Sequence, residues 1–440
     1  MKNHLANASY GILDYAAYPL ALLVVAPFAL RTLGVAQYGV WMFANAALTA
    51  GSVIASGFGD ANIRHVSLRR GMGDWPNLLL SVRSTMGIHT GLGALIASIA
   101  WLLAPVAVPH IAPSNPQLQF ECLWSLRIVS LLIFVRALET VCVSTQRAFE
   151  RYGVAVGYSV LARMLSLAAV LFPIARHSVV VLMLVTAVFL TASLILQFLQ
   201  LAQLLHTVSL WPAFDRDTTR TLLGFGIFSW IQAVSGILYG QADRLLTGVS
   251  LGAAAVASYA LCAQLAQPIY GIVASGLHFL FPYVSARSAS HALPSLRRPV
   301  SLSFAANFVM VVVGAVALLL LGAPVLVRWG GPAIADAGKP ILPLLIVAAA
   351  AQALAVTGSY TMLALGRVRI VTFLNLAGGA GLLLLAPWLL PRYGTEGVAL
   401  ARLCCAPFPL LVYIPLCLLL FRPARTPSHA TSIAAVCEDL

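Results

Sequence analysis

The sequence predicts an all-α polytopic membrane protein with about twelve transmembrane helices arranged as two six-helix bundles. Hydrophobic residues make up 60% of the 440 residues, charged residues only 9%, and the mean hydropathy is +0.93. Soluble domains carry about 25% charged residues, so this chain cannot cover a surface that faces water. The apolar residues also gather in stretches of about 20, enough for a helix to cross the roughly 30 Å hydrocarbon layer.

The expected membrane helices follow one another along the whole chain. They lie at 10–31, 39–60, 78–104, 118–143, 153–175, 178–206, 221–247, 252–282, 300–325, 340–364, 368–390 and 398–421. The first stretch follows Lys2 and a polar segment, as the apolar part of a signal peptide would. No small-residue cleavage site follows Leu30, so we expect an uncleaved first helix.

The basic residues of the connecting segments predict the orientation of the helices. With both termini in the cytoplasm, fifteen Lys and Arg fall on the inner side and five on the outer side. Cytoplasmic loops are the basic ones in membrane proteins, so we expect cytoplasmic termini. Most of the net charge of +13 is therefore a topology signal and indicates no nucleic-acid partner.

A polar interruption from Thr207 to Arg220 divides the predicted helices six and six. We expect an N-terminal bundle at 1–206, a cytoplasmic linker at 207–220, a C-terminal bundle at 221–421 and a cytoplasmic tail at 422–440. An even number of helices per half lets both halves enter the membrane in the same direction, as in a parallel repeat. Leu33-Gly34 with Trp41 and Leu251-Gly252 with Tyr259 support a repeat, because a single offset of 218 residues relates them.

Charges inside the predicted helices are the best indicators of a site. An arginine at the centre of a membrane helix costs about 2.5–3.5 kcal/mol on insertion scales, which disfavours positions that face lipid. Three acids share the membrane with the arginines: Asp14, Glu139 and Asp243. The arginines are Arg83, Arg127, Arg136, Arg163, Arg244 and Arg402.

Spacing separates structural from functional candidates among these charges. Arg136 and Glu139 are three residues apart on one helix, which predicts a structural ion pair. Asp14 and Asp243 are candidates for coupling to protons or sodium, because a buried carboxylate can exchange a proton near neutral pH. Asp243 and Arg244 are adjacent and point in different directions, so we expect one to face a cavity and the other a neighbouring helix.

The remaining arginines are candidates for binding an anionic cargo, because guanidinium binds phosphate bidentately and stays charged when partly desolvated. We expect at least two of them to line a cavity, and Arg31 to assist at the outer end of the first helix. The four that we treat as unpaired are Arg127, Arg163, Arg244 and Arg402.

Two regions resemble polysaccharide flippases of the O-antigen and capsule branch, within the multidrug/oligosaccharidyl-lipid/polysaccharide exporter superfamily. The first contains Leu33-Gly34, Tyr38-Gly39 and Trp41, followed by Gly57-Phe58-Gly59-Asp60-Ala61-Asn62-Ile63-Arg64. The second contains Ala242-Asp243-Arg244, Leu251-Gly252, Tyr259-Ala260-Leu261 and Pro282.

The resemblance implies a V-shaped pair of six-helix bundles around a central cationic cavity. It also implies alternating access that moves an isoprenoid-diphosphate oligosaccharide from the cytoplasmic to the periplasmic leaflet of a bacterial inner membrane, in polysaccharide or lipopolysaccharide biosynthesis. The expected partners are this lipid-linked oligosaccharide, membrane lipids and a coupling proton or sodium ion. We expect a monomer that is not an enzyme. We also expect no cofactor and no metal, since the cysteines lack CxxC spacing and the histidines lack an HxxxH pair.

Two alternatives stay open. A multidrug antiporter of the same superfamily would use acids to bind cationic drugs, whereas this chain places more arginines than acids in the membrane. A polytopic glycan polymerase or ligase would need a large loop with catalytic groups. The longest outer segments expected here, 105–117 and 326–339, are about fourteen residues each, and 105–117 contains no carboxylate.

Overall fold

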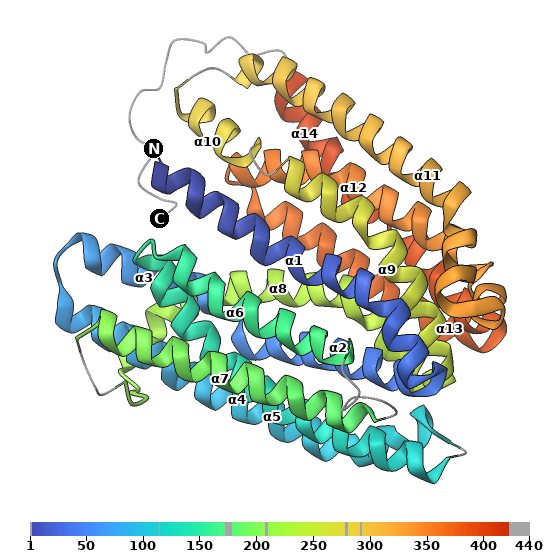
Figure 1. Ribbon diagram of the computed structural model, residues 1–440. Helices are drawn as coiled ribbons and strands as arrows, with labels where there is room; N and C mark the ends of the chain where they lie inside the picture. Colours follow the sequence, from blue (N-terminus) through green and yellow to red (C-terminus); the bar gives the residue numbers. More distant parts are fainter. Residues whose placement is uncertain are drawn as a thin grey trace.

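A computed structural model describes residues 2–113, 115–171, 178–206, 210–277, 280–290 and 293–421. These residues form helices joined by short turns, and the described part of the chain contains no strand. The fold class is the predicted one, and the helices form two groups that lie next to each other (Figure 1). The predicted tail at 422–440 lies outside the described residues, as does Arg176, one of the five basic residues expected on the outer side.

The N-terminal bundle contains seven α-helices within the described residues, and α6 ends in the short helix η1 (Ala169–Leu171). They are α1 (Lys2–Leu33), α2 (Val35–Ser56), α3 (Gly59–Gly71), α4 (Trp75–Ile111), α5 (Pro116–Ala148), α6 (Tyr152–Ala168) and α7 (Val179–Leu204). In Figure 1, α2 to α7 form the lower group and α1 lies along its upper edge. There α1 packs on α6 and also reaches α9 and α11 of the other bundle.

The described C-terminal bundle contains seven further α-helices and two short helices, η3 (Leu293–Leu296) and η4 (Phe408–Val412). The α-helices are α8 (Arg216–Leu251), α9 (Ala253–Gly276), α10 (Leu280–Ser290), α11 (Arg297–Gly338), α12 (Ile341–Ala364), α13 (Val368–Cys405) and α14 (Tyr413–Phe421). Two of them are each interrupted by one glycine with positive φ, Gly331 in α11 and Gly394 in α13.

Most predicted spans overlap one helix, but the span 398–421 covers the end of α13, η4 and α14, and the span 252–282 runs from α9 into α10. By length and composition, eight described helices can cross a membrane, or nine if the bent α8 counts as one span. Two helices extend further than predicted: α4 continues to Ile111, and α11 continues to Gly338, through most of the segment 326–339 that was expected to be a loop. The short helices α3 and α10 were not predicted, since neither carries an apolar stretch of membrane length.

Polar side chains outside the apolar stretches fix where several helices begin. The Asp74 carboxylate accepts a hydrogen bond from the Asn77 backbone N–H at 3.3 Å, and Asp215 accepts one from Thr218 at 2.9 Å. Asn115 caps α5 in the same way and is followed by Pro116 at the first helical position. These caps satisfy the N–H groups that the first helical turn leaves unpaired. The hydrogen bonds from Thr218 hold the pKa of Asp215 below its usual value.

The turns that start the second helix of each bundle have the same backbone geometry. Gly34 has φ 78° and ψ 168°, and Gly252 has φ 83° and ψ 176°. Only glycine adopts this region without strain. The two glycines are the pair that the offset of 218 residues relates, so the repeat seen in sequence is also a repeat in conformation.

Helices α2 and α9, which follow these turns, pack closely against each other across the two bundles. A Cβ atom at Gly39 would lie 1.8 Å from the backbone carbonyl oxygen of Ala253, so this contact requires glycine. Nearby, the Tyr38 hydroxyl donates to Gln264 Oε1 at 3.4 Å. Arg31 adds a second link between the bundles by donating to the Arg328 carbonyl at 3.2 Å.

Helix α8 belongs to both bundles. It bends by 49° between Arg216–Gly224 and Ser229–Leu251. Before and at the bend it packs on the N-terminal bundle, where a Cβ at Gly226 would collide with Phe58 and the Trp230 indole donates to the Ile54 carbonyl at 2.8 Å. Beyond the bend it packs on α13. The described part of the predicted linker is also fixed, because the Ala213 N–H donates to the Arg83 carbonyl at 3.1 Å.

We expect Gly252→Ala to lower the free energy of unfolding by about 1–3 kcal/mol, because alanine is strained at this φ and ψ. Thermal unfolding of the purified protein in detergent measures the loss as a lower melting temperature. Gly91→Ala is the matched control, since Gly91 is helical and its Cβ would meet no atom within 4 Å. Equal melting temperatures for Gly252→Ala and the unmodified protein would contradict this reading of the turn.

Candidate functional site: a polar cavity in the C-terminal bundle

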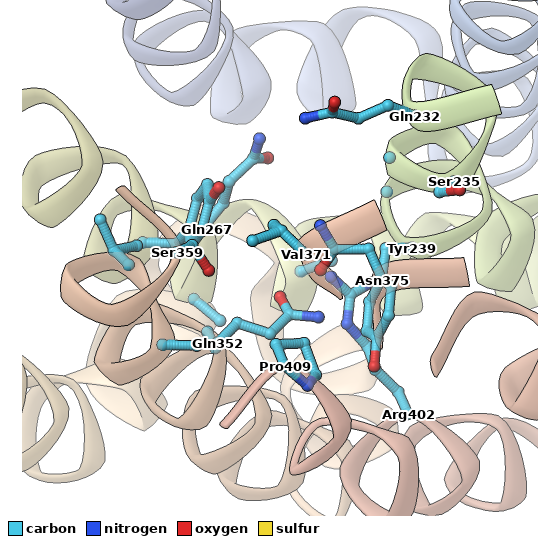
Figure 2. A pocket seen from close by; sticks show the side chains of 18 of the residues that line it. Gln232, Ser235, Tyr239, Gln267, Gln352, Ser359, Val371, Asn375, Arg402 and Pro409 are labelled. Carbon is cyan, nitrogen blue, oxygen red and sulfur yellow. The ribbon is translucent and has the colours of Figure 1, made fainter. Parts of the chain in front are cut away.

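A cavity of about 440 Å³ lies among α8, α9, α12 and α13 (Figure 2). All its described lining residues come from these helices and η4. At one end, Arg402, Tyr239 and Asn375 lie together, while Gln267 and Ser359 lie at the other end and Gln352 points in between them (Figure 2). Each side chain comes from a helix long enough to span the membrane, so the cavity is held by rigid elements.

The lining is polar but carries no acid. Amides and hydroxyls supply both donors and acceptors of hydrogen bonds, and Arg244 and Arg402 supply positive charge. The described lining residues include no Asp, Glu or Lys. The uncharged polar side chains are Gln232, Ser235, Gln267, Gln352, Ser359 and Asn375, with Tyr239, Tyr270 and Tyr360 as aromatic hydroxyls. Such a surface suits a cargo that combines an anion with many hydroxyl groups.

Arg244 is the guanidinium in this cavity that has no counter-ion. Its Nε is buried without an acceptor, and within the described part of the chain no carboxylate or hydrogen-bond acceptor contacts the guanidinium. A buried donor without a partner costs roughly 1–3 kcal/mol, more when it is charged. An anion entering the cavity would recover this cost, which makes Arg244 the strongest candidate for a phosphate ligand.

Arg402 corrects one sequence expectation. We treated it as unpaired, but it forms an ion pair with Asp243, whose side chain is fully buried. The Tyr259 hydroxyl donates to the same carboxylate oxygen at 2.9 Å. The partners are 159 residues apart in sequence, and only the packing of α8 on α13 brings them together. Arg402 therefore lines the cavity with its charge already balanced.

Asp243 and Arg244 diverge because successive residues of a helix point about 100° apart. Asp243 turns toward α13 and α9, and Arg244 turns into the cavity. The same part of α8 places Tyr239 against α13, where its hydroxyl donates to the Cys405 carbonyl. A Cβ at Gly378 would lie 2.1 Å from that hydroxyl, so glycine there makes room for the contact.

Arg127 lies away from the cavity, on the outside of the N-terminal bundle. Its guanidinium stacks on Trp101 and Trp124, at 5.0 Å and 5.2 Å from the ring centroids. Both tryptophans are exposed, at 37% and 40%. The prediction missed this arrangement because the position of a residue along a helix does not reveal which face it occupies.

Arg136 and Arg163 belong to a polar cluster inside the N-terminal bundle, whereas Arg83 donates to the Trp211 carbonyl at 3.0 Å. Arg136 pairs with Glu139 at 2.5 Å, and the same carboxylate accepts from Ser159 at 2.5 Å and Ser193 at 2.9 Å. Arg163 donates from Nε to the Ser159 carbonyl at 3.0 Å.

Two other candidates complete the set. Arg31 is exposed at the end of α1, where it contacts α11 and not the cavity. Position 14 is part of α1, but the Asp14 side chain lies outside the described residues. Sequence reasoning overlooked the amides of the lining because it considered charges alone. Their signal was available, since Gln352 and Asn375 interrupt otherwise apolar helices.

Comparison with known proteins gives a family and a fold. A family model described as polysaccharide biosynthesis protein matches residues 5–287. No curated protein matches the chain. The lipid II flippase MurJ in an inward closed conformation has a TM-score of 0.72 at 12% identity, with 94% of this chain and 86% of that chain covered.

Two states of multidrug resistance MATE family transporters of the MOP superfamily also match. The inward-facing one has a TM-score of 0.70 at 14% identity, covering 93% of this chain and 98% of that chain. The outward-facing one has a TM-score of 0.56 at 13% identity, covering 92% of both chains.

The buried Arg136–Glu139 pair generates a stability prediction. Glu139→Gln leaves the Arg136 charge without its carboxylate, and breaking a buried pair in this way costs about 3–5 kcal/mol. We expect a lower melting temperature of the purified protein and partial recovery in the double variant Arg136→Gln/Glu139→Gln. Asp336→Asn, on the exposed side of α11, serves as the control. An unchanged melting temperature for Glu139→Gln would show that the pair contributes little.

Proposed function

The chain belongs to the polysaccharide biosynthesis protein family of the MOP superfamily, and from this premise we propose that it flips a lipid-linked oligosaccharide across the membrane. The cargo would carry an isoprenoid diphosphate and move from the cytoplasmic to the periplasmic leaflet of a bacterial inner membrane. The setting would be the biosynthesis of a polysaccharide such as the O-antigen of lipopolysaccharide. Both termini and the segment 207–220 would then be cytoplasmic.

The observation that carries this proposal is Arg244, whose guanidinium has no counter-ion among the described residues and lies in a cavity whose described lining contains no acid. Guanidinium binds phosphate with two parallel hydrogen bonds. The amides and tyrosines of the same cavity match the hydroxyls and apolar faces of a sugar. We assign the diphosphate to the Arg244 and Arg402 end and the first sugars to the end with Gln267 and Ser359.

The cavity chemistry disfavours the alternative of a multidrug antiporter. A cationic drug would meet Arg244 and Arg402, and the described lining offers no carboxylate to hold it. The same lack of acids disfavours a glycan polymerase or ligase, because general acid–base chemistry needs a positioned carboxylate or histidine.

We expect Arg244→Gln to reduce flipping of an isoprenoid-diphosphate oligosaccharide about tenfold or more, because it removes the charge-assisted hydrogen bonds to phosphate. Proteoliposomes holding the fluorescently labelled cargo report flipping as loss of access to an external quencher. Arg392→Gln is the control, because Arg392 is exposed and stacks on Trp388 instead of facing the cavity. Undiminished flipping by Arg244→Gln, or faster movement of a cationic dye than of the cargo, would contradict the proposal.

Asp243 is the candidate for ion coupling. A phosphate that binds Arg402 would compete with Asp243 for the same guanidinium. We propose that this competition links cargo binding to a proton. Asp14, the other carboxylate proposed for coupling, remains a candidate because it lies in a predicted membrane helix.

We expect Asp243→Asn to bind cargo but to lose the acceleration that a pH gradient gives, because asparagine cannot exchange a proton. Flipping in proteoliposomes with and without a pH gradient measures this, with Asp336→Asn as the control. A full response to the gradient in Asp243→Asn would remove Asp243 from the coupling mechanism and leave the cargo assignment standing.

A further inference from the structure

A second cationic site lies on the outer surface of the N-terminal bundle, far from the cavity lining. It consists of Arg127 between Trp101 of α4 and Trp124 of α5, and Phe120 extends the aromatic surface through a ring contact with Trp124 at 6.2 Å. Trp101, Trp124 and Phe120 are all exposed, so this surface faces outward from the bundle.

The Arg127 guanidinium is held in place and still open to a ligand. The two indoles orient it, and only its Nε is completely buried. Among the described residues, no acceptor or carboxylate contacts any of its nitrogen atoms. The two Nη groups therefore reach the surface as donors, in the planar geometry that matches two oxygens of a phosphate.

The depth of the site matches a lipid headgroup. Trp101 lies three residues from the end of the expected span 78–104, at the α4–α5 connection, and tryptophans gather at this boundary of membrane helices. Arg127 lies nearer the middle of α5, but helical side chains point toward the N-terminus, which here is the same end. The guanidinium is thus directed at the boundary between hydrocarbon and headgroups.

We propose that Trp101, Arg127 and Trp124 form a binding site for the phosphate of an anionic phospholipid headgroup. Arg127 binds the phosphate oxygens, and the indoles cover the upper part of the acyl chains. The nearest acid in sequence, Glu121, is 7% exposed and accepts a hydrogen bond from the Val179 N–H at 2.8 Å. No described carboxylate is thus free beside Arg127 to receive a headgroup ammonium, which favours a headgroup without a cation.

This inference is independent of the proposed cargo, because none of the three residues lines the cavity. It gives Arg127 a ligand that stays with the protein and is not transported. Failure of the lipid site would leave the function of Arg244 unaffected, and the reverse also holds.

Native mass spectrometry of the delipidated full-length protein in detergent tests the site by titration with dioctanoyl phosphatidylglycerol. We expect Arg127→Gln to weaken the tightest lipid binding about tenfold or more. Arg392→Gln is the matched control, because Arg392 stacks on one exposed tryptophan, Trp388, whereas Arg127 lies between two. We expect this control to change binding less than about twofold.

Trp101→Leu keeps the charge and removes one face of the clamp, so it tests the site even if Arg127→Gln does not fold. We expect weaker binding of phosphatidylglycerol in Trp101→Leu, and weak binding of phosphatidylcholine and inorganic phosphate in the unmodified protein. Equal phosphatidylglycerol binding in either folded variant and the unmodified protein would overturn the proposal. Equally tight binding of phosphatidylcholine or of inorganic phosphate would overturn the assignment to an anionic lipid.

Discussion

The cost of holding a charge away from water organises this protein. An arginine inside the membrane needs a carboxylate, an aromatic face, a backbone carbonyl or an aqueous cavity beside it, because lipid tails offer none of these. Arg136 finds Glu139, Arg402 finds Asp243, and Arg127 finds two indoles. Arg244 turns into the cavity without a counter-ion. Among these four arginines, Arg244 is the one whose charge stays available to a ligand inside a bundle.

The paired charges also hold the helices that shape the cavity. Asp243 contacts α13 through Arg402 and α9 through Tyr259, so one carboxylate joins three of the four helices around it. Tyr239 adds a contact to α13 one turn away. In the other bundle, Glu139 joins α5 to α6 and α7 through two serines. Each bundle thus has a buried acid at the meeting point of its helices.

Composition and hydropathy predicted the helices well, because the length of an apolar stretch depends on the membrane alone. The repeat was also visible, since Gly34 and Gly252 are required by a backbone geometry that other residues resist. The site was only partly predictable. Arg244 and Arg402 could be identified as intramembrane charges, but the partner of Arg402 is 159 residues away and Arg127 faces outward. Contacts between distant helices and the faces that side chains occupy depend on packing, which a single sequence does not display.

The bend in α8 determines how this helix joins the two bundles. Near the bend this helix packs on the N-terminal bundle, and beyond the bend it packs on α13 and also on α2, where a Cβ at Gly248 would lie 2.2 Å from the Phe43 ring. Helix α8 therefore contacts both bundles along its length and joins them by packing. The bend lies between Gly224 and Ser229, next to the Phe58 and Trp230 contacts that hold α8 against the N-terminal bundle. Because Arg244 lies beyond the bend, the angle of α8 determines where this arginine lies relative to the N-terminal bundle.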